Sequence, residues 1–208
     1  EGGLVFHFTV KGPTSALLPN GYGIRVRNAA TLQSNVAGAP LVRGLTIVSD
    51  QAAYIQGDYN VNGKIPAAVM ADSLNELSNN WNDANSAAAI GSRTASSTTY
   101  NLAFLGGTDS TGGLEGIGGQ NGYYNGGLEN YPRFHENWSG FINRYRGSFV
   151  SLGTPLHVNG RWSNQSYNPP NRDWNYDTSF NNAANLPPIT PRFVYLRQEL
   201  FVRDFDGE

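Results

Sequence analysis

The chain has 208 residues, of which 39% are hydrophobic and 14% are charged, and its formal net charge is −2. This length predicts a single domain, 1–208, with one sizeable core. The near-neutral charge argues against nucleic acid as a partner, because phosphate binding needs a basic patch. The absence of cysteine excludes a disulfide framework and a thiolate metal site.

Strand signals follow one another along the first half of the chain. Runs of β-branched and aromatic residues that end at Gly, Pro or Asp predict short strands at 4–10, 22–26, 44–50 and 53–59. Residues 66–78 allow two interpretations. Met70, Leu74 and Leu77 fit one face of a helix, whereas two short strands joined at Asp72 continue the spacing of the preceding runs. The strands are favoured.

The second half mixes loops with further strands. Residues 82–99 have loop composition, and 106–127 are rich in glycine. Strands are predicted at 100–105, 146–152 and 192–202. The part from about 106 to 191 is expected to be irregular and rich in loops. No stretch approaches the 18 apolar residues of a membrane span.

These elements predict an all-β fold. Short apolar runs that end in Gly, Asn or Asp at regular intervals are typical of a β-solenoid. We therefore expect a right-handed, β-helix-like solenoid with long irregular loops, in which asparagine amides are satisfied by neighbouring turns. A β-sandwich is the alternative.

Eight segments carry a family resemblance: residues 3–7, 23–30, 44–60, 66–72, 126–134, 136–138, 145–152 and 167–177. They resemble the C-terminal region of PilX-like, type IV pilus-associated proteins and of HpsA-like cyanobacterial hormogonium polysaccharide biosynthesis proteins. The resemblance implies a bacterial protein at the cell surface or outside the cell, in a structural role. It implies no catalytic residue.

The N-terminal run is a candidate subunit contact. It has no Lys, Arg, Asp or Glu between Leu4 and Val10, and an uncharged terminal strand can pair with another chain. The predicted contact residues are Leu4, Phe6, Phe8 and Val10. The alternative is that this run and the run at 193–202 pair within their own chain.

Aromatic residues are the candidate sugar or partner contacts. Trp138, Trp162, Trp174 and Tyr176 alternate with arginines and asparagines, a combination that can stack on sugar rings or contact a protein. Packing in the core is the other interpretation of the same residues.

Three aspartates follow successive apolar runs. Asp50, Asp58 and Asp72 could align on one edge of a solenoid and bind Ca²⁺ or act as acid and base. The alternative is that they cap turns.

The three histidines, His7, His135 and His157, lack the spacing of metal ligands. No catalytic motif, cofactor site or metal site is predicted. The expected function is therefore a non-enzymatic surface protein, a subunit or accessory component of a pilus-like filament or polysaccharide matrix, with other copies, other filament subunits or a polysaccharide as partners. The alternative is a carbohydrate-binding or polysaccharide-processing β-helix module.

Overall fold

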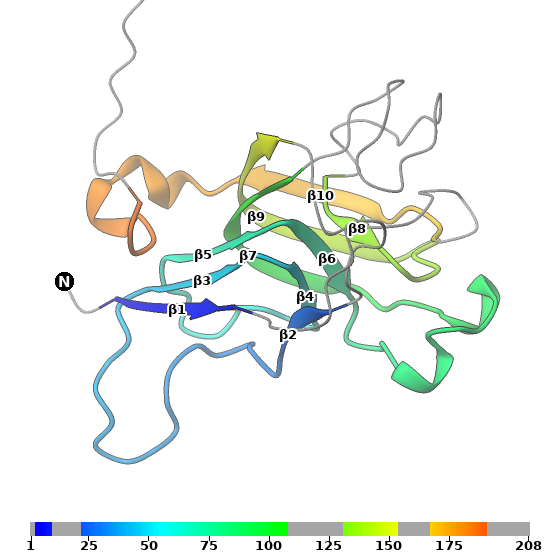
Figure 1. Cartoon of the computed structure of the whole chain (residues 1–208), viewed down its shortest axis with the longest axis horizontal. Helices are drawn as coiled ribbons and strands as arrows, with labels where there is room; N and C mark the ends of the chain where they lie inside the picture. The colour runs from blue at the N-terminus through cyan, green and yellow to red at the C-terminus, as the bar shows by residue number, and fades with distance from the viewer. Residues whose placement is uncertain (1–2, 10–21, 108–130, 154–166, 191–208) are drawn as a thin grey trace, which may run out of the picture.

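A computed structural model describes residues 3–9, 22–107, 131–153 and 167–190 (Figure 1). The strands are β1 (Leu4–Phe8), β2 (Gly23–Arg27), β3 (Leu45–Ser49), β4 (Ala52–Gln56), β5 (Ala67–Ala71), β6 (Ser73–Leu77), β7 (Thr98–Gly107), β8 (Arg133–Phe134), β9 (Ile142–Gly153) and β10 (Asn171–Tyr176). The connections contain short 3₁₀ helices: η1 (Asp83–Asn85), η2 (Ile90–Ser92), η4 (Thr178–Asn181) and η5 (Ala183–Asn185).

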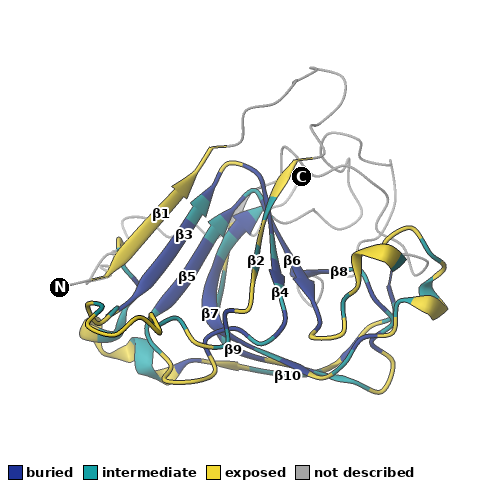
Figure 2. Cartoon of the chain, turned by 90° about the horizontal axis from the view of Figure 1, so that it is seen from below, coloured by how far each residue is buried: buried dark blue, intermediate teal, exposed yellow. Residues whose placement is uncertain are grey.

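The strands form two sheets in which every described pair is parallel. One sheet has six strands in the order β1-β3-β5-β7-β9-β10, and the other has four in the order β2-β4-β6-β8. From β1 to β8, consecutive strands alternate between the two sheets, which face each other across the core in Figure 2. The alternation then ends, because β9 and β10 both join the six-stranded sheet.

The predicted all-β β-solenoid, right-handed and β-helix-like, is wrong, and so is the alternative β-sandwich. The described strands form two open sheets rather than a closed coil, and a sandwich is built from antiparallel strands. Parallel sheets of this kind are usual in α/β proteins, and the helices here are short 3₁₀ segments. The prediction failed because buried parallel strands also read as short apolar runs ended by Gly or Asp. Such runs do not reveal how the sheets close.

A column of apolar side chains crosses the six-stranded sheet and forms one wall of the core. Parallel pairing places Phe6 beside Ile47, Ile47 beside Val69, Val69 beside Phe104, and Phe104 beside Phe149. Ile47, Val69 and Phe104 are buried in the core. The register of the sheet therefore places apolar residues in one row, which runs from β1 to β9.

Buried asparagines satisfy main-chain groups at the turns, as predicted. Asn60 has a positive φ of 56° and lies fully buried. Its Nδ2 donates to the carbonyl oxygens of Ile65, at 2.7 Å, and of Asn101, at 2.9 Å. The Asn101 amide in turn donates to the carbonyl of Asn60 at 3.0 Å. The amides thus link neighbouring turns without leaving these donors unpaired.

Several predicted strands are confirmed within one to four residues of their expected ends. Residues 66–78 form the strands β5 and β6, with Asp72 between them, and not a helix. Strand β10 was not predicted. The run at 192–202, Val10, Trp162 and His157 lie outside the described residues.

Candidate functional site

The outer side of β1 is an open edge of the six-stranded sheet, and we call it the β1 edge (Leu4–Phe8). Within the described chain, β1 pairs with β3 on one side only. The amide of Leu4 donates to the carbonyl of Gly44 at 2.8 Å. The N–H and C=O groups of successive strand residues point to opposite sides of the strand. The main-chain groups of Phe6 and Phe8 therefore face β3, as those of Leu4 do. The N–H and C=O groups of Val5 and His7 then point outward, to the side where no described strand pairs with β1.

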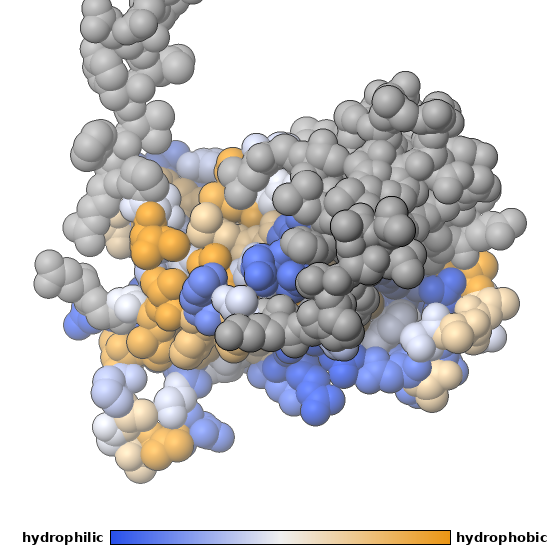
Figure 3. All heavy atoms as spheres, in the orientation of Figure 1, coloured by the Kyte–Doolittle hydropathy of each residue, from blue (hydrophilic) through white to orange (hydrophobic). Residues whose placement is uncertain are grey.

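The β1 edge also exposes large apolar side chains. Leu4, Val5, Phe6 and Phe8 are 42–47% exposed, whereas Ile47, the partner of Phe6, is 4% exposed. Figure 2 shows β1 as exposed along its length beside the buried β3. Hydrophobic residues gather on this side of the molecule in Figure 3. An exposed row of this kind is a candidate interaction surface.

Charge distinguishes the β1 edge from the other described edges. Of the four edge strands in the two described sheets, β1 alone has no Lys, Arg, Asp or Glu. On β10, the Asp173 carboxylate pairs with Arg144 at 3.0 Å and with Arg146 at 2.9 Å. On β2, Arg25 and Arg27 provide charges. Charged edges resist strand pairing, so β1 is the edge that best accepts another strand.

The predicted aromatic contact residues do not form one surface. Trp138 is fully buried and packs edge-on against Phe134 in the core. Trp174 is half-buried, and its Nε1 donates to Oδ1 of Asn143 at 2.6 Å. Tyr176 is 54% exposed. The core-packing interpretation therefore holds for Trp138, and of the described candidates Tyr176 is the one that offers a large surface.

The aspartates do not share one edge. Asp50 follows β3 and Asp72 follows β5, so these two lie at corresponding corners. Asp58 lies beyond the far end of β4, where its Oδ1 accepts the Thr99 amide at 2.8 Å. Asp58 is therefore a turn cap. Among the residues that the structure describes, no group of three or more His, Asp or Glu side chains could hold a metal ion.

Two buried carboxyl groups were not anticipated. Glu76 is fully buried on β6, where burial raises its pKa to about 8, and Asn143 donates a hydrogen bond to it. Glu136 is also buried, and burial raises its pKa; it accepts hydrogen bonds from the amide of Ser78, at 2.6 Å, and from its hydroxyl, at 2.7 Å. Strand alternation was the available signal for Glu76, since it places this residue on the same face as Leu74.

His135 is half-buried at the end of β8. Its Nε2 lies 2.7 Å from Oδ1 of Asn75, and its ring contacts that of Tyr54 with centroids 5.8 Å apart. Burial, with help from Arg133 and Arg93, lowers its pKa to about 4. The imidazole is therefore neutral at pH 7.

Comparison with protein-family models, with curated proteins and with solved structures finds no match to this chain. No helix in the described ranges is long and apolar enough to span a membrane.

Proposed function

We propose that this chain is a non-enzymatic structural protein that joins other copies of itself through the β1 edge. In this role it is a subunit or accessory component of an extracellular, pilus-like filament or a polysaccharide matrix. The observation that carries the proposal is the uncharged edge strand with exposed Leu4, Phe6 and Phe8. The extracellular setting is supported by the family resemblance of the eight segments.

Strand addition is the mode of contact that this edge favours. The incoming strand, from a neighbouring copy, pairs with the outward main-chain groups of Val5 and His7. Its side chains cover the exposed end of the apolar column at Phe6. Main-chain hydrogen bonds provide affinity, and the side chains fix the register.

The strand need not leave its own sheet for this contact. Leu4–Phe8 pairs with β3 over five residues, so this run belongs to its own sheet; the run at 193–202 of the same interpretation lies outside the described residues. A strand therefore adds to β1 from outside. Exchange of β1 between copies is not required.

Sedimentation velocity over a concentration series, with negative-stain microscopy of the most concentrated samples, tests the proposal. The wild type is expected to associate as concentration rises, and Phe6→Lys to stay monomeric because it places a charge on the β1 edge. Val36→Lys is the matched control, since Val36 is 68% exposed in the loop before β3. A monomeric wild type at high concentration, or equal association of both variants, contradicts the proposal.

A further inference from the structure

A cleft of about 380 Å³ lies on the outward face of the four-stranded sheet, away from the β1 edge. Its volume falls in the range of small-ligand sites, about 300–1,000 Å³. A larger cavity, of about 730 Å³, is lined mostly by Gly, Ala, Pro and aliphatic residues and has no aromatic residue and no carboxylate among the described residues that line it. The side chains that shape the smaller cleft are Arg25, Tyr54, Trp81, Asp83, Arg93 and His135.

Sheet pairing and a local turn place two aromatic rings in the cleft. Arg25 and Tyr54 are direct neighbours across β2 and β4. A Cβ on Gly23 would lie 3.0 Å from the Tyr54 ring, so the missing side chain makes room for this ring. Trp81 is half-buried, and its Nε1 donates to Oδ1 of Asp83 at 2.8 Å. The indole is therefore held in one orientation before any ligand arrives.

The charged groups of the cleft are within reach of solvent. Nη1 and Nη2 of Arg25 donate to Oδ1 and Oδ2 of Asp83, at 2.5 and 3.0 Å, yet the two side chains stay 32% and 65% exposed. Arg93 adds a second positive charge to the lining, and Arg27 lies close enough to lower the pKa of Asp83 together with Arg25. With His135 neutral, the cleft has a net positive charge and a single carboxylate.

We propose that this cleft binds an acidic saccharide, a glycan that contains uronic acid units. The apolar face of a sugar ring stacks on Trp81 and Tyr54, as aromatic surfaces allow. The sugar carboxylate lies against Arg93 and Arg25, through charge-assisted hydrogen bonds. Ring hydroxyls donate to Asp83.

The mixed charge selects this ligand class over its competitors. A neutral glycan has no negative group to pair with the excess positive charge of the cleft. A polyphosphate has no hydroxyl donors for Asp83 and is repelled by its carboxylate. A uronate offers one negative charge and several hydroxyl donors per ring, which matches two arginines beside one aspartate.

Isothermal titration calorimetry with hexagalacturonate, and with maltohexaose as the neutral counterpart, tests the site. The wild type is expected to bind hexagalacturonate at least about tenfold more tightly than maltohexaose. Trp81→Ala and Arg25→Gln are each expected to weaken that binding by about tenfold or more, the size of effect that a buried aromatic or Arg contact has in an interface. Thermal melting of each variant shows whether it is folded.

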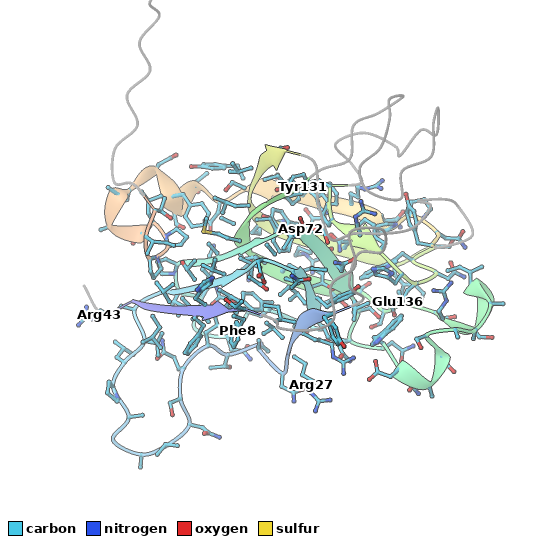
Figure 4. The ribbon with its side chains drawn as sticks, viewed as in Figure 1. Phe8, Arg27, Arg43, Asp72, Tyr131 and Glu136 are labelled. Carbon is cyan, nitrogen blue, oxygen red and sulfur yellow. The ribbon has the colours of Figure 1, made fainter. Side chains whose placement is uncertain are left out.

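Two matched controls separate the cleft from the rest of the surface. Arg43→Gln removes an equal charge from an exposed residue that lies far from Glu136, the neighbour of His135, in Figure 4. Tyr176→Ala removes an exposed aromatic ring elsewhere. Both variants are expected to bind as the wild type does. If Trp81→Ala does not fold, Trp81→Phe, which keeps an aromatic ring but loses the N–H, serves with Arg25→Gln.

The outcomes decide the proposal. No binding of hexagalacturonate, equal binding of maltohexaose, or loss of binding in Arg43→Gln as large as in Arg25→Gln overturns it. Loss in Tyr176→Ala but not in Trp81→Ala also overturns it, because the site would then lie at the aromatic residues near the end of β10.

Discussion

The two ends of the apolar column in the six-stranded sheet differ in how far they are exposed to solvent. At the β9 end, Phe149 stacks on Tyr145 with ring centroids 4.3 Å apart, and Trp174 of β10 packs edge-on against Phe149 at 5.2 Å. Arg172 lies over the Trp174 ring at 5.3 Å. At the β1 end, Phe6 continues the same column and is 47% exposed. The ends share their chemistry and differ in whether a further layer covers them.

The difference supports the proposal that the β1 edge is an interface. The β10 edge has a covering aromatic layer and paired charges, whereas the β1 edge has neither among the described residues. Natural sheets protect their edges with charges or covering segments. An unprotected edge on a stable sheet is therefore a place for a partner.

The largest expected effect comes from phenylalanines at two positions of the column. Phe104→Ala should destabilise the fold by about 3–5 kcal/mol, because it leaves a cavity among packed rings. Phe6→Ala should cost the monomer less than about 1 kcal/mol, since that ring is already exposed. Urea unfolding of both variants measures the difference, and equal losses would mean that the β1 end is covered.

A second prediction concerns Glu76, whose raised pKa reflects how well the covered part of the core excludes water. The unfolded chain releases this proton near pH 4.5, but the folded chain keeps it until about pH 8. Stability therefore falls between these pH values as pH rises, by about 1.4 kcal/mol per unit. His135, with a folded pKa of about 4 against 6.5, acts in the opposite direction below pH 6.5. The Glu76 effect is thus separated from it between pH 6.5 and 8.

Glu76→Gln should remove a loss of about 2 kcal/mol across that interval. Chemical unfolding at pH 6.5, 7.25 and 8 measures it, with Asp50→Asn, at an exposed carboxylate, as the control. If wild type and Glu76→Gln have parallel pH profiles, the carboxyl is hydrated and this part of the core is open to water.

A small effect on monomer stability is also expected at Val5. Its amide points away from β3, so Val5→Pro removes an outward donor and keeps the pairing with β3. The monomer should lose no more than about 1 kcal/mol, yet concentration-dependent association should disappear. Phe6→Pro is the matched control, because it removes a donor to β3 and should destabilise the monomer. Association of Val5→Pro at wild-type concentrations would argue against main-chain pairing at this edge.

Much of the local structure could be predicted, because each early strand is a short β-branched or aromatic run ended by Gly or Asp. The sheet arrangement could not, since the same runs suit a closed coil and two open sheets. Strand β10 was missed because its residues are polar and charged, with Trp174 as the clearest strand former. Its place as an edge strand explains why such a sequence is tolerated there.

The site was predictable in part for the same reason. The missing charge of residues 4–8 is visible in the sequence, but their exposure depends on which strand lies beside β1. The cleft joins Arg25 to Asp83, 58 residues apart, and only the pairing of β2 with β4 and the turn after β6 bring them together. Trp138 shows the opposite case. The sequence allows it as a surface contact, but the structure buries it in the core.

Amide hydrogen exchange at residues 4–8, in dilute and in concentrated samples, tests the central claim most directly. The amides of Leu4, Phe6 and Phe8 should be protected in both, because they face β3. Those of Val5 and His7 should exchange freely in the dilute monomer and become protected as copies associate. Unchanged exchange at Val5 and His7 in an associated sample, or protection already present in the monomer, would contradict strand addition at the β1 edge.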